Sequence, residues 1–350
     1  MRAVRIHKLT STDAFIAFDL DDAPSATGVV RCARKVLESS ASELARASTY
    51  MFAAFGLEVG GASAGINAEG DDVAAAKAAF VEEIAEMVAA GTFLPNPALG
   101  VTPEDLAALT GADTRSALRF ESVGGTPLPD HLVGVGAVAA AEALSGDLSG
   151  RTVAIDGFDA AGPTLATELA ARGAKVVAIA TRSGAAVSKD GFDATALSEA
   201  WAAHGQDLVS ELGVEAGMEW KVRATPVDVF FAGAKIGSID HKNADKLPVK
   251  AIVPTGPLPY TTKAWVMLER RDVKLLPDFA SIGGQVFAGF PPDGVDTIDG
   301  AVAAARSAVT DLIAEISTHE RGAVMGGFAH AESFLRTWRD ELPFGRPLAP

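Results

Sequence analysis

A glycine-rich turn at residues 157–162 is the stretch whose residue types most directly imply chemistry. It reads GFDAAG and lies between an apolar run, RTVAID (151–156), and a helical pattern, PTLATELAARGA. In this context G-x-G-x-x-G is typical of a dinucleotide site. Gly157 makes the tight turn, the second glycine lets the backbone approach the diphosphate, and Gly162 lets helix and strand pack closely. The second glycine, however, is replaced by Asp159.

A carboxylate at Asp159 lies where a diphosphate would bind. Two like charges about 4 Å apart cost about 4 kcal/mol at an effective dielectric constant of 20, unless the side chain turns to solvent or to a cation. The next strand ends Ala180-Thr181-Arg182-Ser183, without the acid that binds a ribose 2′-hydroxyl, and Arg182 favours a 2′-phosphate and hence NADP. The pattern therefore predicts either a dinucleotide site or a βαβ unit that serves only in packing. The candidate cofactor-binding residues are Gly157, Phe158, Asp159, Ala160, Ala161, Gly162, Thr181, Arg182, Ala232 and Gly233.

Two other polar residues are candidates for acid–base or ligand-binding roles. His131 follows Asp130, and a histidine beside an acid can exchange protons near neutral pH, although a single histidine also serves in packing. Lys235 comes just after the apolar run VDVFFA (227–232). Doubly wound sheets bind ligands at that end of a strand, so Lys235 is either a ligand-side residue or an ordinary surface lysine.

The elements that must position these residues alternate between apolar runs and helical patterns after residue 149. Apolar runs of strand length are RTVAID (151–156), KVVAIA (175–180), VDVFFA (227–232), KAIVP (250–254) and VKLLP (273–277). A long helix is predicted over residues 298–316. Buried strands that alternate with helices indicate a parallel sheet covered on both faces, hence a Rossmann-type doubly wound α/β domain.

The N-terminal part has a different pattern. AFIAFDLD (14–21) and TGVVRCAR (27–34) read as strands, and helices are predicted over about 42–55 and 73–90, with Gly91 as the C-cap of the second. We therefore predict an α/β substrate-type domain over residues 1–135, the Rossmann domain over 136–300, and C-terminal helices over 301–350 that return toward the first domain.

Composition limits the partners. The 350 residues include 30 basic and 45 acidic ones, for a formal charge of −15 that disfavours nucleic acid and anionic membranes. The single cysteine, Cys32, can form neither an internal disulfide nor a thiolate zinc site, and no metal is expected. The start lacks the apolar core of a signal peptide, and no apolar run reaches the length of a membrane span, so we expect a cytoplasmic protein.

With these elements in place, the whole chain resembles the glutamate/leucine/phenylalanine/valine dehydrogenase family. The likeness is strongest in SGRTVAIDGFDAAGPTLATELAARGAKVVAIATRSGA, where the family shows a strand, G-F-G-N-V-G and a helix ending in G-A-K-V-V. It continues through VDVFFAGAKIGSIDHKNADKL, PTGPLPYTTKAWVMLERRDVKLLPDF and SIGGQ, and the N-terminal segments ATGVVRCAR and ELARASTYMFAAFGLEVGGASAGI follow the order of the substrate domain. The resemblance implies NAD or NADP as cofactor.

At the positions of the family's catalytic residues, the resemblance implies that this chain has lost the reactive side chains. The lysine that holds the substrate carboxylate is replaced by Met51, and the catalytic lysine of G-G-G-K by Ser63. The aspartate that moves the proton is replaced by Ala98. Without these groups no side chain at these positions can perform the acid–base steps of oxidative deamination. Common L-amino acids are therefore not expected to be substrates.

Other family positions also differ. The asparagine of A-N-A-G-G is Ser281 or Ile282, and that of the G-A-N loop is Pro257, whereas Asp278 matches a family aspartate and is expected to be structural. Two functions stay open: an NAD(P)-binding oxidoreductase with another substrate, and a non-catalytic paralogue that assembles with a related dehydrogenase or another enzyme. In both cases we expect an oligomer built through the first domain, because its two apolar strands read as lying near an end of the sheet.

Overall fold

The computed structural model describes residues 4–20, 22–214 and 216–349, and it divides into two compact units. The first unit comprises the described residues up to Arg115 together with Phe328–Pro347. The second comprises Ser116–Gly327 and the residues from Leu348 onward. Asp21, the last residue of the first predicted strand, lies outside the described residues.

The first unit is built on a five-stranded mixed sheet. Its strand order is β1 (Arg5–Lys8), β2 (Ala14–Phe18), β4 (Gly60–Asn67), β3 (Ala26–Ala33), β5 (Leu94–Pro97). β3 runs parallel to β4 and β5, whereas β1 and β2 pair in antiparallel fashion. The helix α1 (Glu38–Ala54) lies directly on β4, and α2 (Asp72–Ala89) contributes Phe80 and Ile84 to the core that also holds Ala62 and Ala64 of β4.

The small residues of β4 allow α1 to lie close to the sheet. A Cβ atom added at Gly61 would lie 1.9 Å from the carbonyl oxygen of Ala45 in α1. Only glycine fits such an approach of two backbones. This packing fixes the face of the sheet on which Ser63 lies.

The two strands predicted near an end of this sheet are each next to an edge strand, and neither is itself an edge. β2 is covered by β1, and β3 lies between β4 and β5. β1 has the sequence RIHK and is mostly exposed, so it carries no apolar run that sequence inspection could detect. The helices predicted over 42–55 and 73–90 are present as α1 and α2.

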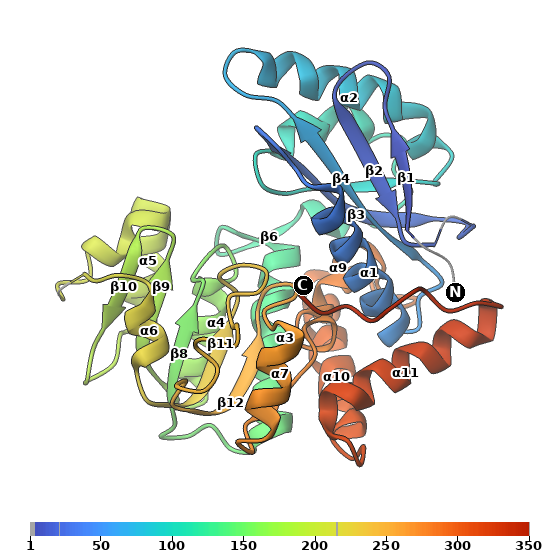
Figure 1. Cartoon of the computed structure of the whole chain (residues 1–350). Coiled ribbons are helices and arrows are strands. Elements are labelled where there is room, and N and C mark those ends of the chain that lie inside the picture. The colour runs from blue at the N-terminus through green and yellow to red at the C-terminus, as the bar shows by residue number, and fades with distance from the viewer. Residues whose placement is uncertain (1–3, 21, 215, 350) are drawn as a thin grey trace. The chain divides into compact units, whose positions relative to one another are not determined.

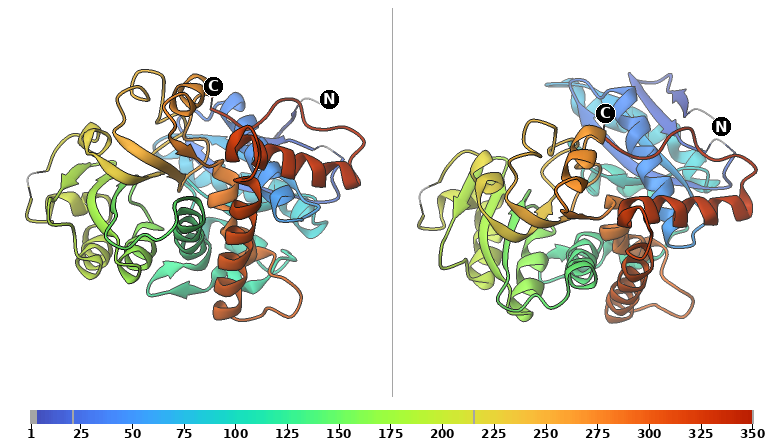
Figure 2. Two further views of the ribbon diagram at one scale, coloured as in Figure 1. Left: turned by 90° about the horizontal axis from the view of Figure 1, so that it is seen from below. Right: turned by 60° about the horizontal axis from the view of Figure 1, so that its bottom comes forward.

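The second unit contains the predicted doubly wound sheet. Its strand order is β10 (Gly184–Val187), β9 (Lys175–Thr181), β8 (Thr152–Asp156), β11 (Val227–Ala232), β12 (Val249–Pro254), β13 (Lys274–Leu275). All neighbours are parallel except β10, which pairs antiparallel to β9. The helices α3 (Leu128–Ser145), α4 (Gly162–Ala171) and α5 (Ala194–His204) cover one face, and α6 (Trp220–Ala224) and α7 (Thr262–Glu269) cover the other (Figures 1 and 2). The predicted α/β class and parallel sheet are therefore confirmed.

The boundary between the units differs from the one predicted at residue 135. The chain divides after Arg115, because α3 packs on α4 and on α10 (Ile298–Ile316) within the second unit. The long helix predicted over residues 298–316 has these bounds, and it stays in the second unit. α11 (Gly322–Trp338) starts there, and its residues from Phe328 belong to the first unit.

The remaining elements are short. They are η1 (Glu104–Leu109), η2 (Ala117–Phe120), β6 (Ser122–Val123), β7 (Thr126–Pro127), η3 (Gly205–Ser210), α8 (Asp278–Ser281), η4 (Gly283–Gln285) and α9 (Val286–Gly289).

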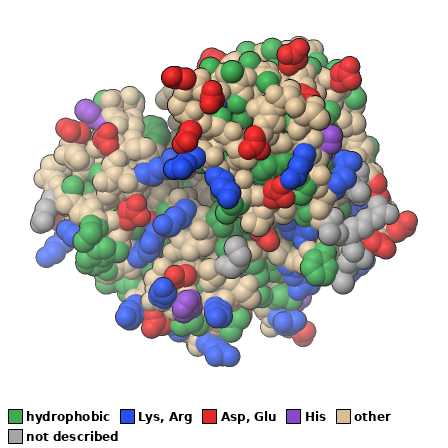
Figure 3. Space-filling model, turned by 45° about the horizontal axis from the view of Figure 1, so that its top comes forward, with side chains coloured by type: hydrophobic (Ala, Val, Ile, Leu, Met, Phe, Trp, Pro, Cys, Tyr) green, Lys and Arg blue, Asp and Glu red, His purple; other side chains and the backbone are tan. Residues whose placement is uncertain are grey.

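Charge is mixed on the surface, although the acidic residues are in excess. On the face drawn in Figure 3, lysine and arginine side chains lie among aspartate and glutamate side chains. Among the described residues, no helix combines the length and the apolar character needed to cross a membrane.

Candidate dinucleotide site

The turn GFDAAG connects β8 to α4 and is held by the neighbouring strands. The backbone N–H groups of Gly157 and Phe158 both donate to the carbonyl oxygen of Ala180 in β9, at 3.1 and 2.7 Å. Gly157 has φ +100°, and a Cβ atom there would lie 2.4 Å from the backbone nitrogen of Ala234. Glycine is therefore required at 157 both by its conformation and by the segment that follows β11.

The ends of β8 and β11 meet at this turn. The N–H of Gly233 donates to the carbonyl oxygen of Asp156 at 2.7 Å, and Ala232 is paired in register with Asp156. The structure thus brings Ala232 and Gly233 next to Gly157, as expected for strand ends on the ligand side of a parallel sheet.

The third glycine has a different role from the one predicted. A Cβ atom at Gly162 would lie 2.5 Å from the ring of Phe158, so Gly162 makes room for that ring rather than for a strand. Phe158 is fully buried and contacts Trp201 of α5, with ring centroids 6.0 Å apart. The turn is therefore anchored in the core by an aromatic side chain.

Asp159 interacts with the first backbone groups of α4. Its Oδ1 accepts a hydrogen bond from the N–H of Ala161 at 3.1 Å, and its carbonyl oxygen accepts one from the N–H of Gly162 at 2.9 Å. The N-cap residue, Ala161, offers no side-chain cap of its own. A carboxylate that accepts from the first turn of a helix is favoured by the helix dipole.

The electrostatic surroundings of Asp159 favour its protonated form. Desolvation by surrounding protein atoms raises the pKa of Asp159 to about 6, and Asp130 also raises it, whereas the N–H of Ala161 and the guanidinium of Arg182 lower it. The side chain itself is exposed to solvent, which opposes this desolvation. The raised pKa of Asp159 favours a neutral carboxyl, which would not repel an anionic ligand.

Arg182 lies in a tight hairpin between β9 and β10. Thr181 uses its hydroxyl to donate to the carbonyl oxygen of Gln206 at 2.6 Å, so its side chain is engaged within the fold. Arg182 is exposed, and its positive charge acts on Asp159. An acid is also present here, although it comes from η3 rather than from the strand end: Asp207 accepts from the hydroxyl of Ser183 at 2.6 Å.

His131 is brought to the start of α4. Its Nδ1 lies 2.9 Å from the hydroxyl oxygen of Thr164, and the ring is half-buried. Desolvation lowers the pKa of His131 and raises that of the neighbouring Asp130. Both shifts favour neutral side chains near the loop. The contact with Thr164 fits a structural role. The ring is also partly accessible to solvent, which an acid–base role requires.

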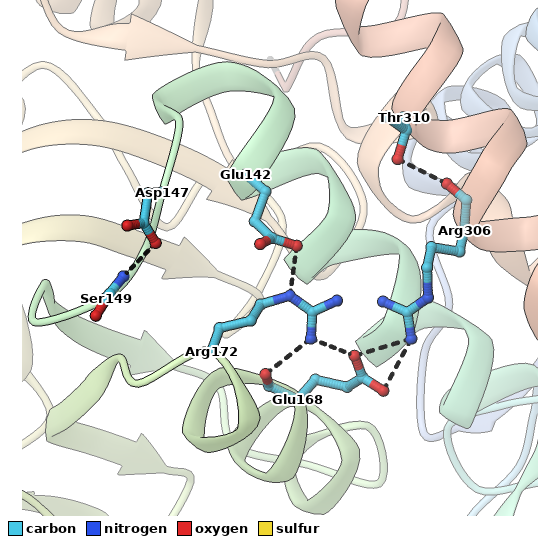
Figure 4. A network of polar contacts seen from close by, with 7 residues as sticks. All are labelled: Glu142, Asp147, Ser149, Glu168, Arg172, Arg306 and Thr310. Atoms are coloured by element: carbon cyan, nitrogen blue, oxygen red, sulfur yellow. Dashed lines mark hydrogen bonds and ion pairs between the residues drawn. The ribbon is translucent and has the colours of Figure 1, made fainter.

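An ion-pair network holds the helix that follows the loop. Glu168 of α4 accepts from Arg172 at 2.7 Å and from Arg306 of α10 at 2.9 Å, and Arg172 also bonds Glu142 of α3 (Figure 4). Three helices are tied together through two acids and two arginines. This network restrains the direction of α4, and with it the position of the turn.

The residue just before the turn carries an interaction that sequence inspection did not reveal. Asp156 ends β8, is 1% exposed, and accepts from Nε of Arg223 in α6 at 2.7 Å. Desolvation raises the pKa of Asp156, whereas Arg223 and Lys235 lower it. Lys235 thus lies near the end of β8, and it is exposed.

The three positions that the family resemblance assigned to chemistry lie in the first unit. Ser63 is fully buried in β4, and its hydroxyl has no hydrogen-bond partner among the described residues. Met51 is half-buried in α1, and the N–H of Ala98 donates to the carbonyl oxygen of Val30 in β3 at 3.1 Å. None of these three side chains can carry a positive charge or transfer a proton at neutral pH, apart from the weakly acidic hydroxyl of Ser63.

The other family positions are two buried polar residues and one exposed proline. Ser281 is fully buried and donates to the carbonyl oxygen of Pro254 at 2.8 Å. Asp278 accepts from the N–H of Leu258 at 2.8 Å and fixes that residue at φ +51°. Pro257 is exposed in the same loop. Among the described residues, no group of three histidine, cysteine, aspartate or glutamate side chains is placed to hold a metal ion.

Comparison with known proteins finds a family match that includes the turn. Residues 124–290 match the family model described as Glutamate/Leucine/Phenylalanine/Valine dehydrogenase. A glutamate dehydrogenase of Aeropyrum pernix is 31% identical over 157 residues, which is 45% of this chain and 37% of that protein. The NADP-specific glutamate dehydrogenase A1 of Halobacterium salinarum is 31% identical over 143 residues, or 41% of this chain and 34% of that protein. Over residues 124–290 the chain is therefore similar to this family.

The matched region thus spans about a third of the length of each of these relatives, whereas structural likeness extends further. The hetero-hexameric glutamate dehydrogenase of Thermus thermophilus, in a Leu-bound form, superposes with a TM-score of 0.78 at 21% identity, covering 95% of this chain and 86% of that one. A glutamate dehydrogenase of Plasmodium falciparum gives a TM-score of 0.77 at 16% identity, over 94% of this chain and 80% of that one. At such identities the likeness shows the fold.

Proposed function

We propose that this chain is an amino-acid-dehydrogenase-like protein that binds NAD or NADP but does not deaminate common L-amino acids. The observation that carries the proposal is the contrast between its two units. The turn after β8 keeps the glycine, the strand contacts and the following helix of a dinucleotide site. The first unit has Met51, Ser63 and Ala98 where the family resemblance requires two lysines and an aspartate.

The substrate argument rests on chemistry that these side chains lack. Oxidation of an α-amino acid needs a cation for the substrate carboxylate and a group that removes a proton as hydride leaves for the nicotinamide. A thioether, a buried hydroxyl and a methyl group supply neither. A substrate of another class would have to be oxidised with the help of other residues. His131, which contacts Thr164 of α4, and Lys235, which acts on Asp156, are the candidates in the second unit.

For the cofactor, Arg182 favours NADP. Its exposed guanidinium follows β9 at the place where a ribose 2′-substituent would lie, and a 2′-phosphate would pair with it. Asp207 nearby accepts from Ser183 and would instead suit a free 2′-hydroxyl. The relative from Halobacterium salinarum is named NADP-specific, which agrees with the first choice.

Calorimetric titration with NAD⁺ and NADP⁺, combined with a dehydrogenase assay on glutamate, leucine, phenylalanine and valine, tests the proposal. We expect measurable binding of at least one dinucleotide and no reduction of either by the four amino acids. Robust turnover of any of them would overturn the substrate part. Absence of binding at every pH, in the wild type and in variants at Asp159, would overturn the cofactor part.

A second function is favoured by one comparison. The Thermus thermophilus protein that shares this fold is a hetero-hexamer, so at least one glutamate dehydrogenase assembles from more than one kind of chain. A chain without the family's reactive groups could serve as the non-catalytic member of such an assembly. Mixing the purified chain with a related dehydrogenase from its native source, and measuring mass and activity together, would separate this function from the first.

A further inference from the structure

The turn after β8 already contains an anion. In dinucleotide-binding loops the free N–H groups at the start of the following helix point at the diphosphate. Here the N–H of Ala161 donates to Oδ1 of Asp159 at 3.1 Å, and the N–H of Gly162 donates to the carbonyl oxygen of the same residue at 2.9 Å. The N–H groups of Gly157 and Phe158 are taken by Ala180. Most backbone donors of the turn are therefore engaged within the protein.

We propose that the carboxylate of Asp159 is an internal occupant of the anion position in this loop, so that the loop accepts the diphosphate of a dinucleotide only after this side chain is protonated or displaced. The inference rests on the proposed dinucleotide site and adds its regulation: the site is blocked by its own carboxylate at neutral or alkaline pH and opens as the pH falls.

Three features of the surroundings support such control. The helix α4, which has ten residues, presents its positive end to the carboxylate. The charged side chains that act on Asp159 are Asp130 at the start of α3, which disfavours its charge, and Arg182 in the β9–β10 turn, which favours it. The side chain is exposed, so protons and ligands can reach it.

The sign of the effect follows from the titration of this carboxyl. Desolvation and Asp130 raise the pKa of Asp159 to about 6, so the carboxyl is mostly charged at pH 7.5 and mostly neutral at pH 5.5. A diphosphate disfavours the charged form further. If only the neutral form admits the ligand, the apparent affinity scales with the neutral fraction and rises by about 25-fold between these two pH values.

Calorimetric titration of NAD⁺, whose diphosphate stays ionised throughout this range, is the direct test. The wild type should bind about 25-fold more tightly at pH 5.5 than at pH 7.5. Asp159→Asn keeps a side-chain oxygen for the Ala161 N–H but has no charge, and Asp159→Gly restores the family's glycine. Both variants should bind at pH 7.5 at least as tightly as the wild type does at pH 5.5, with a change of less than about twofold across the range.

Asp147→Asn is the matched control, because Asp147 is also exposed and its Oδ1 also accepts a backbone N–H two residues onward, from Ser149 at 2.9 Å (Figure 4). This variant should keep the wild-type pH profile. Thermal melting of each variant checks that it is folded.

The possible failures are distinguishable. If the wild type binds NAD⁺ equally at both pH values and the two Asp159 variants match it, the blocking role of Asp159 is wrong and the dinucleotide site stands. If neither the wild type nor either Asp159 variant binds NAD⁺ or NADP⁺ at pH 5.5 or 7.5, the dinucleotide site itself is wrong, and the turn serves only in packing.

Discussion

Arg223 donates through Nε to Oδ2 of Asp156 at 2.7 Å, and this ion pair lies at the last residue of β8, directly before Gly157. Asp156 is 1% exposed and the side chain of Arg223 16% exposed, so the pair is largely removed from water. The two residues are 67 positions apart. Their contact joins α6 to the strand that carries the candidate site.

Removal of one partner of this pair should destabilise the protein. Arg223→Ala leaves the buried Asp156 carboxyl without its cation, and loss of one member of a buried pair costs about 3 kcal/mol or more. Urea unfolding at pH 7.5 measures the loss. The double variant Arg223→Ala/Asp156→Asn should recover much of it, because the uncompensated charge is gone. Arg270→Ala, at an exposed position of the same unit, is the control and should change stability little. An equal loss of stability in Arg223→Ala and in the control Arg270→Ala would contradict the prediction.

The ion pair is an example of a contact in the site that could not be predicted from the sequence. The turn itself was predictable, because the glycines, the apolar run before them and the helix pattern after them are contiguous. Arg223 approaches Asp156, and Arg182 approaches Asp159, only because parallel strands bring distant segments to one edge of a sheet. The role of Gly162 was mispredicted for a related reason, since it depends on where the ring of Phe158 packs.

The fold was predictable to the extent that its strands are buried. β11 and β12 are apolar apart from one charged residue near the start of each, and α10 has a clear helical repeat, so their bounds were found within a residue. β1 and β10 are short edge strands that show no clear apolar alternation in sequence. β4 reads GGASAGIN, a run of small residues without a clear strand pattern. The tertiary contact with α1 explains these small residues, and no local signal carries that information.

Two buried hydroxyls in the first unit should respond differently to removal. Ser63 and Thr49 are both fully buried, but Thr49 accepts a hydrogen bond from the N–H of Gly61 at 2.9 Å, whereas the Ser63 hydroxyl has no partner among the described residues. Thr49→Ala should cost about 1–3 kcal/mol, because it leaves a buried N–H unsatisfied. Ser63→Ala should be neutral or stabilise by up to about 1 kcal/mol.

Urea unfolding of the two variants under one set of conditions checks this pair, with each serving as the control for the other. A loss above about 1.5 kcal/mol for Ser63→Ala would mean that its hydroxyl has a partner, and the description of that position as an unused polar group would be wrong.

Asp278 should make stability depend on pH in a defined direction. Desolvation raises the pKa of this buried carboxyl to about 6, above its ordinary value of 3.8. The folded state therefore binds the proton more tightly than the unfolded state, so the contribution to stability is complete below about pH 3.8 and is lost as the pH rises through about 6. Asp278→Asn keeps an oxygen for the N–H of Leu258 and removes this dependence.

The free energy of unfolding of Asp278→Asn, relative to the wild type, should thus rise by up to about 3 kcal/mol from pH 4 to pH 7.5. Denaturant unfolding across this range measures the difference, in which the titration of other groups cancels. Asp193→Asn, at the exposed N-cap of α5, is the control. A constant difference for Asp278→Asn, or a fall with rising pH, would contradict the predicted sign.

The last prediction concerns assembly, and we expect an oligomer formed through the first unit. Among the described residues, the open edge of its sheet on one side is β1, which pairs only with β2 and whose side chains are mostly exposed. An open edge can pair with another chain, and a symmetric copy or a related subunit would close it. The formal charge of −15 opposes unspecific association, so a specific assembly should persist when moderate salt screens the repulsion. Light scattering behind a sizing column measures the mass at low and moderate salt. A monomer of 35.9 kDa at micromolar concentration would exclude self-assembly, and the hetero-oligomer would then stand only if a related dehydrogenase shifted that peak.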